Sequence, residues 1–140
     1  MSGAKKIDEI EAKNGAGDKP ELLSKKDILS LDDRQYEIFY VEEWDGHVPL
    51  TGLDAWQQSQ YEQSLIEAST DAEGEMQIVS KMEGADVRLA AMGIRNPGNA
   101  PWFTEEELRV KSGAAIKKIA NRLRELSGMD AKSRKAAKGN

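Results

Sequence analysis

The strongest pattern along the chain is an alternation of apolar and polar residues on either side of an Asp-Gly pair. Residues 36–44 are rich in aromatic and β-branched side chains, Asp45-Gly46 has the composition of a two-residue turn, and residues 47–50 lead back. The pattern predicts a β-hairpin, and its period of two places four apolar residues on the face that should meet the core. These residues are Phe39, Val41, Val48 and Leu50.

The length of the turn sets the expected register of this hairpin. A two-residue turn pairs Trp44 with His47 and Val41 with Leu50. Pro49 has no N–H to donate, so its strand is expected to be an edge at that point. Because a lone two-stranded sheet is marginal in water, helices are expected to cover its apolar face.

Elsewhere the apolar residues recur every three or four positions, which is typical of amphipathic helices. The spacing predicts helices over residues 24–31, 54–68, 75–94, 105–110 and 112–127. Three of these helices begin with capping residues. The caps are Ser24, Asp54 followed by Gln57, and Thr104 followed by Glu107.

The predicted helices differ in how their apolar residues are arranged. In the helix over residues 24–31, Ile28 and Leu31 are expected to face inward. The helix over residues 75–94 has stripes on two sides, so it is either covered on both sides or bent at Gly84. Two further helices each have one broad stripe. These stripes are Leu53, Trp56, Tyr61, Leu65 and Ala68 in the first, and Ile116, Ile119, Ala120, Leu123 and Leu126 in the last.

The chain is expected to form one folded domain with loose ends. Residues 1–21 bury too little to offset the entropy of ordering and are predicted to be a disordered extension. Residues 22–129 form the predicted domain, Gly128 lies just after its last helix, and residues 130–140 are a flexible basic tail. The predicted fold is α+β and mostly helical, with a β-hairpin packed against about four α-helices and disordered N- and C-terminal ends.

Charge is distributed unevenly along the 140 residues, although the net charge is only −5. Ten acids and no base occur between Arg34 and Lys81, whereas residues 109–140 contain ten bases and two acids. A bipolar chain of this kind can associate head to tail or bind an acidic partner through its basic end. Solvated helix faces followed by a basic tail explain the same distribution without any partner.

The residue types argue against catalysis and against metal or cofactor binding. The chain has no cysteine and a single histidine, His47, so thiolate chemistry and multi-histidine metal sites are excluded. Glu42, Glu43 and Asp45 cluster at the predicted hairpin tip, where a carboxylate is not buried enough to act as a general acid or base. No glycine pattern matches a phosphate loop. We therefore predict a protein that is not an enzyme and needs no cofactor.

The remaining function classes depend on binding. Nucleic-acid binding would depend on residues 109–138 alone, because the aromatic residues that could stack on bases lie elsewhere and an acidic domain repels phosphate. Trp44 lies at the predicted hairpin tip, where it either packs on the core or acts as a contact anchor. Candidate partner-binding residues are Trp44, His47, Lys117, Lys118 and Arg124. The chain has no apolar run long enough to span a bilayer and no signal-peptide core, so a soluble protein is expected.

Several short motifs, and their order along the chain, resemble the tail assembly chaperones of long-tailed bacteriophages and related prophages. The central one is Val-Glu-Glu-Trp-Asp-Gly-His-Val-Pro-Leu-Thr-Gly-Leu at residues 41–53, followed by Tyr-Glu-Gln-Ser-Leu at residues 61–65. The resemblance extends over about residues 23–129, while Asp54 and Gln57 depart from the family pattern. The other matching segments are residues 27–29, 32–34, 88–91, 103–108, 111–116 and 126–129.

The resemblance implies a non-catalytic assembly factor of the host bacterial cytoplasm. Such proteins keep the tape measure protein, a long hydrophobic helical chain, soluble until tail tube subunits polymerise around it, and they are absent from the mature virion. The implied partners are the tape measure protein and the major tail tube protein, with self-association possible and no membrane involved. Two alternatives remain open: a head–tail connector or completion factor that stays in the particle, and a nucleic-acid-binding accessory protein that uses residues 109–138.

Overall fold

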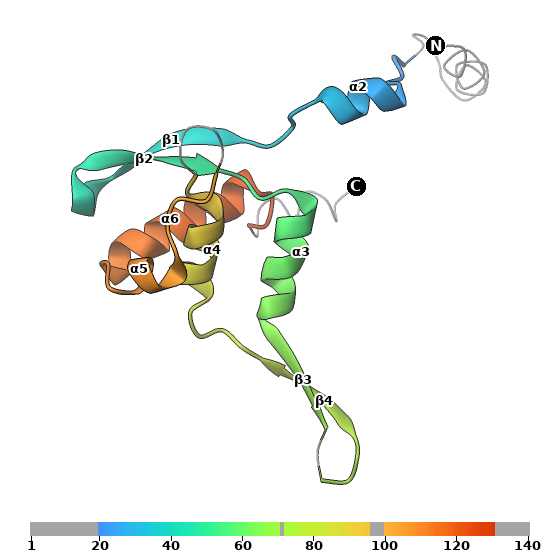
Figure 1. Ribbon diagram of the computed structural model, residues 1–140, viewed down its shortest axis with the longest axis vertical. Helices are drawn as coiled ribbons and strands as arrows, with labels where there is room; N and C mark the ends of the chain where they lie inside the picture. Colours follow the sequence, from blue (N-terminus) through green and yellow to red (C-terminus); the bar gives the residue numbers. More distant parts are fainter. Residues whose placement is uncertain (1–19, 71, 96–99, 131–140) are drawn as a thin grey trace. The chain divides into compact units, whose positions relative to one another are not determined.

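The computed structural model describes residues 20–70, 72–95 and 100–130 (Figure 1). The predicted disordered extension and basic tail therefore lie almost wholly outside the described residues. The chain divides into two units, residues 1–33 and residues 34–140. Over the described residues the fold is α+β, with a two-stranded antiparallel hairpin packed against helices, as the sequence predicts.

The described part of the first unit contains one short helix, α2 (Lys25–Ser30). Its start is fixed by a capping box, in which Ser24 Oγ accepts from the Asp27 N–H at 3.1 Å and the Asp27 carboxylate accepts from the Ser24 N–H at 3.2 Å. Ile28 and Leu31 are exposed, so the prediction that they face inward is wrong. Six residues form fewer than two turns, and the described part of this unit has no second element that could cover them.

The second unit begins with the predicted hairpin, formed by β1 (Tyr36–Val41) and β2 (Gly46–Thr51). The predicted register is wrong, because the 3-10 turn η1 (Glu42–Trp44) and a left-handed Asp45 form a longer connection than a two-residue turn. Leu50 consequently pairs with Glu37. The shift is by an even number of residues, which leaves Phe39, Val41, Val48 and Leu50 together on one face as predicted, and Val41 and Leu50 are fully buried.

Four helices complete the second unit: α3 (Ala55–Ser64), α4 (Ala85–Gly93), α5 (Glu105–Arg109) and α6 (Gly113–Leu126). The predicted capping boxes before α3 and α5 are both present. Gly128 has a φ of 71°, the left-handed conformation expected just after the end of α6. The local start and stop signals therefore placed three helix ends correctly.

The core lies between the inner face of the β1–β2 hairpin, α4 and one face of α6 (Figure 1). The predicted stripe of the last helix is confirmed, since its residues from Ile116 to Leu123 are buried and Leu126 packs against them. The largest fully buried side chains come from five different elements or their ends. They are Val41, Leu50, Leu89, Ile94, Leu108, Ile119 and Leu123.

Two glycines allow backbone segments to approach α6 closely. A Cβ atom at Gly93 would lie 2.3 Å from Leu123 Cδ2. A Cβ atom at Gly52 would lie 2.7 Å from the carbonyl oxygen of Leu126. Both distances are shorter than carbon contacts permit, so only glycine fits where α4 and the end of β2 meet α6.

The region between α3 and α4 contradicts the sequence prediction of two long helices. The chain leaves α3 at Ser64 and forms a second antiparallel hairpin, β3 (Ile66–Thr70) and β4 (Met76–Ser80), before Gly84 begins α4 with a φ of 74°. Of the two alternatives for residues 75–94, cover on both sides or a bend at Gly84, neither describes one helix, because Gly84 is the residue at which α4 begins. Trp56 is also exposed, so it does not belong to the buried stripe predicted for α3.

Candidate interaction surface

The β3–β4 hairpin has an apolar face that no part of the described chain covers. Its register pairs Ile66 with Ser80 and Thr70 with Met76, which places Ile66, Met76 and Ile78 on the same face. These three side chains are 50%, 74% and 70% exposed, respectively. The hairpin begins at the end of α3 and extends away from the helices α4, α5 and α6 (Figure 1). We call this hairpin the β3–β4 ribbon.

The base of the ribbon is attached to the folded body by polar contacts. The Lys81 N–H donates to the Leu65 carbonyl and closes the end of the ribbon. Arg88 of α4 donates to Ser64 Oγ at 3.0 Å and to the Glu83 carbonyl at 3.3 Å, and its Nε lies 3.9 Å from a Glu105 carboxylate oxygen. One arginine thus bonds to both chain segments that lead into and out of the ribbon.

The ribbon lies in the acidic part of the chain. No basic residue occurs between Arg34 and Lys81, and Glu73 and Glu75 next to the turn are exposed. A hairpin with exposed apolar side chains and acidic surroundings can bind the apolar side of another polypeptide while the acidic groups keep the complex hydrated. Covering exposed apolar groups with a partner removes them from water, which is favourable. The ribbon is therefore the strongest candidate interaction surface.

Of the predicted partner-binding residues, two lie at the tip of the β1–β2 hairpin. Trp44 is half-buried and packs against the core, which agrees with the packing alternative rather than with an exposed anchor. His47 is exposed, as predicted, and its ring centroid lies 5.2 Å from that of Tyr40. The structure therefore leaves only His47 of this pair on the surface.

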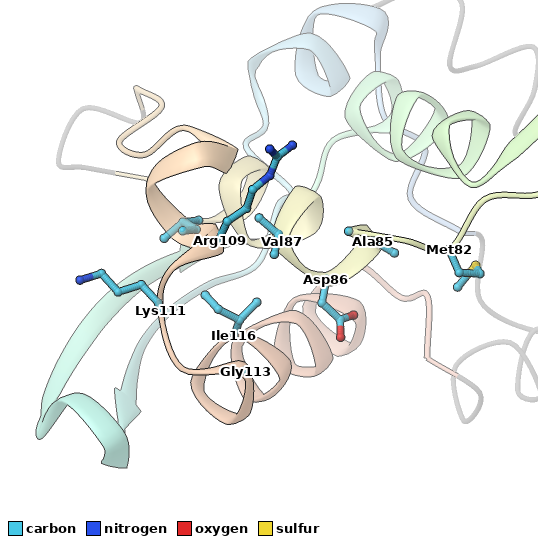
Figure 2. Close-up of a pocket in the computed structure, with 10 residues that line it drawn as sticks. Met82, Ala85, Asp86, Val87, Arg109, Lys111, Gly113 and Ile116 are labelled. Carbon is cyan, nitrogen blue, oxygen red and sulfur yellow. The ribbon is translucent and has the colours of Figure 1, made fainter.

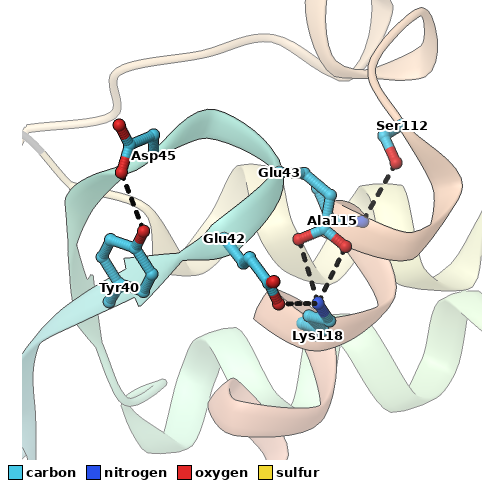
Figure 3. A network of polar contacts seen from close by, with 7 residues as sticks. All are labelled: Tyr40, Glu42, Glu43, Asp45, Ser112, Ala115 and Lys118. Carbon is cyan, nitrogen blue, oxygen red and sulfur yellow. Dashed lines mark hydrogen bonds and ion pairs between the residues drawn. The ribbon is translucent and has the colours of Figure 1, made fainter.

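Lys118 of α6 connects the same hairpin tip to the helix (Figure 3). Its Nζ donates to both carboxylate oxygens of Glu43, at 2.8 and 3.1 Å, and lies 3.8 Å from Glu42. The hydrogen bond from Lys118 lowers the pKa of the Glu43 carboxyl, and the same bond raises the pKa of the Lys118 ammonium. Nearby, the Tyr40 hydroxyl donates to Asp45 at 2.8 Å, which raises the pKa of Tyr40.

Replacing Lys118 with Gln is expected to lower stability near neutral pH but not in acid. The lowered Glu43 pKa stabilises the fold above the ordinary carboxyl value of 4.5, and this contribution is lost as the pH falls through the folded-state pKa. Urea midpoints of the wild type and K118Q should therefore differ slightly at about pH 7 and converge well below pH 4.5. Lys117→Gln, an exposed neighbour, is the control and should change neither midpoint. An equal deficit for K118Q at both pH values would contradict the assignment.

Arg124 and Lys117 occupy different environments on α6. Lys117 is exposed. Arg124 is half-buried and donates to Asp86 at 2.6 Å and to the Tyr61 hydroxyl at 3.1 Å. Burial opposes the charge of Arg124, but the bonds to Asp86 and Tyr61 outweigh it and raise the pKa of the guanidinium. Arg124 therefore joins α6 to α3 and α4 within the chain.

The pairing of α6 also bears on the nucleic-acid alternative. Six basic residues lie in the described part of the basic segment, residues 109–130, and three of them form ion pairs with carboxylates. Two of the three are Lys118 and Arg124, described above. The other is Arg122, which pairs with Glu37 of β1 and with Glu125. These intramolecular pairs reduce the charge that this part of the segment could offer to phosphate.

A hollow of about 340 Å³ lies between the start of α4 and the α5–α6 connection (Figure 2). Its charged side chains are Asp86, Arg109 and Lys111, and they do not converge on one point (Figure 2). Asp86 is already bonded to Arg124. Among the described residues no cluster of three carboxylates or histidines could hold a metal ion. The hollow thus lacks the nucleophile–base geometry that hydrolytic or transfer chemistry requires.

Comparison with known proteins does not identify the chain. No family model, curated protein or solved structure matches it. Within residues 20–70, 72–95 and 100–130, no helix is both long and apolar enough to cross a membrane.

The sequence reasoning missed the ribbon, although a signal was present. Ile66 and Ala68 alternate with the polar Glu67 and Ser69, and Ile78 and Val79 farther along are β-branched. Gly74, which has a φ of 84°, lies in the connection between the strands. A period of two next to a turn glycine indicates a hairpin, but the same apolar residues also fit a helical stripe.

Proposed function

We propose that this chain is a non-catalytic tail assembly chaperone of a long-tailed bacteriophage or prophage. In this role it binds the tape measure protein in the host cytoplasm and keeps it soluble until tail tube subunits polymerise around that protein. The motif order in residues 23–129 supports the family, and the exposed apolar face of the β3–β4 ribbon supports the mode of action.

The chemistry of the ribbon suits a client that is long, helical and apolar. Ile66, Met76 and Ile78 can pack along the apolar side of a helix, and methionine adapts to varied partner shapes. Acidic side chains near the ribbon remain in water and oppose aggregation of the complex.

The small size of this surface favours reversible binding. Burying one large apolar side chain contributes about 1.5–3 kcal/mol, and three such contacts must also offset the entropy of association. One copy therefore binds weakly, and many copies bound along a long client would together keep the client soluble. Tube subunits that bury more of the client can then displace the chaperone.

Co-expression with the cognate tape measure protein tests this proposal. We expect the tape measure protein to move from the insoluble to the soluble fraction and to co-purify with this chain, while purified virions contain none of it. A tape measure protein that is equally insoluble with and without the chain would overturn the proposal. So would recovery of the chain in mature particles in ring stoichiometry, which would favour the connector alternative. Salt-sensitive DNA binding without client binding would favour the accessory protein.

A further inference from the structure

The apolar face of the β3–β4 ribbon ends beside a second hollow, of about 680 Å³. Ser80 lies on the same face of β4 as Met76 and Ile78, because side chains alternate along a strand. Ser80 pairs with Ile66 of β3, the third apolar residue of that face, and it also lines the hollow. The apolar face and the hollow therefore adjoin at Ser80.

This second hollow adjoins the smaller one between the start of α4 and the α5–α6 connection (Figure 2). Met82, Gly84 and Arg109 line both of them, and Met82 is 57% exposed. The smaller hollow is also lined by the buried apolar residues Leu108 and Ile116. Because the two hollows share these residues, they form one groove from the base of the ribbon to the start of α6, which we call the basal groove.

The charged side chains of the basal groove leave an excess of positive charge. Two of its carboxylates are already occupied, because Asp86 bonds Arg124 and Glu105 lies 3.9 Å from Arg88. The other charged residues that line the groove are exposed, form no ion pair within the described part of the chain, and are mostly cations. They are Lys81, Arg109, Lys111 and Glu83.

The groove and the ribbon therefore differ in charge. No basic residue occurs between Arg34 and Lys81, so Lys81, directly after β4, marks the change from the acidic to the basic part of this surface. The cations of the groove do not gather at one point, since Arg109 and Lys111 point in different directions (Figure 2). They consequently suit several carboxylates along a polypeptide better than one small anion.

We propose that the basal groove binds acidic side chains next to the apolar segment of the client that lies on the ribbon. This inference rests on the proposed function and specifies the chemistry of the client segment. The face from Met76 to Ser80 spans about 13 Å at about 3.3 Å per residue, which equals about nine residues of a helix. The preferred segment is therefore an apolar helical stretch of about this length, with a run of Asp and Glu at the end that lies in the groove.

Charge then determines the direction in which such a segment binds. In one direction its acidic end meets the three unpaired cations of the groove. In the opposite direction the same end lies along the ribbon, where the chain has no basic residue before Lys81. The second arrangement is disfavoured because like charges then face each other.

Fluorescence anisotropy of labelled peptides mixed with the full chain tests this inference. Each acidic peptide has an apolar helical stretch of about nine residues with about four glutamates before or after it, and each comparison peptide has glutamines in their place. We expect an acidic peptide to bind about five- to tenfold more tightly, because each exposed ion pair contributes little but three act together. This difference should shrink as the salt concentration rises, since salt screens exposed charges.

Two triple variants separate the groove from a general effect of charge. The first replaces the three unpaired cations of the groove with glutamine and should remove the difference between the peptides. The second replaces three exposed lysines outside the groove, changes the net charge equally and should keep the difference. The variants are K81Q/R109Q/K111Q and K25Q/K26Q/K117Q, respectively. All six side chains are exposed, so thermal unfolding should show that both variants fold.

Equal affinity for acidic and glutamine peptides, or a difference that K81Q/R109Q/K111Q retains, would overturn this inference. In that event the proposed function still predicts that M76T/I78T weakens the binding of both kinds of peptide, because it alters the apolar face. Failure of the proposed function has a different result. In that case neither kind of peptide binds, or M76T/I78T leaves their binding unchanged, and this inference fails with it.

Discussion

Replacing Leu123 with Ala is expected to lower the free energy of unfolding by about 3 kcal/mol. Leu123 is fully buried in the last turn of α6, and its Cδ atoms lie so close to Gly93 that a Cβ there would not fit. Removing these atoms loses their transfer free energy and leaves a cavity that the packed α4 and α6 backbones cannot close. A domain of this size has about 5–15 kcal/mol of stability, so the loss is a large fraction.

Urea unfolding followed by circular dichroism measures this effect. The matched control is Leu29→Ala, which deletes the same atoms from an exposed position on α2 and should change stability by less than about 0.5 kcal/mol. Equal effects of the two substitutions would contradict the placement of the core between α4, α6 and the β1–β2 hairpin.

Local signals in the sequence predicted the parts of the fold that short-range chemistry determines. The capping boxes at Asp54 and Thr104 and the left-handed Gly128 place helix ends through contacts within four residues. The apolar stripe of α6 is continuous from Ile116 to Leu126, about three turns, and has no competing interpretation as a strand. These elements needed no knowledge of tertiary contacts.

The register of the β1–β2 hairpin depended on a turn that composition alone could not specify. Asp45-Gly46 is a common two-residue turn, yet here Glu42, Glu43 and Trp44 form a 3-10 turn first. In the structure Glu43 bonds Lys118 of α6 and Trp44 packs on the core, and both contacts join residues far apart in sequence. Local propensity could not include those contacts.

In the β3–β4 ribbon, the local sequence pattern does not distinguish a helix from a strand. Residues 64–80 contain apolar positions that fit both a helix and a strand, and the large apolar side chains described from Ile66 to Val79 are exposed, so no core contact of theirs decides between the two. The prediction of helix there was wrong because the two periods coincide over a short run. As a result, the candidate site named from the sequence included Trp44 and Arg124, which bind within the chain, and omitted Met76 and Ile78.

The second large effect is expected when the apolar face of the β3–β4 ribbon is made polar. The double substitution Met76→Thr with Ile78→Thr removes two of the three large apolar side chains on that face while keeping residues that favour strands. Their burial against a client contributes about 1.5–3 kcal/mol each, so client affinity should fall at least about tenfold. Both side chains are exposed, so the free energy of unfolding of the chain should change little.

Val79→Thr provides a matched control on the same strand. Val79 lies on the opposite face of β4, so this substitution changes the same kind of chemistry without touching the proposed contact. Near wild-type client binding by V79T would exclude a general effect of polar substitutions in the ribbon.

The most direct test of the account measures how much tape measure protein stays soluble per molecule of this chain. The wild type, V79T and M76T/I78T are each co-expressed with the client, and the soluble client that co-purifies is quantified. The account predicts that the wild type and V79T hold similar amounts and that M76T/I78T holds about a tenth or less. Equal amounts with all three chains would contradict the claim that this protein acts by binding an apolar client through the β3–β4 ribbon.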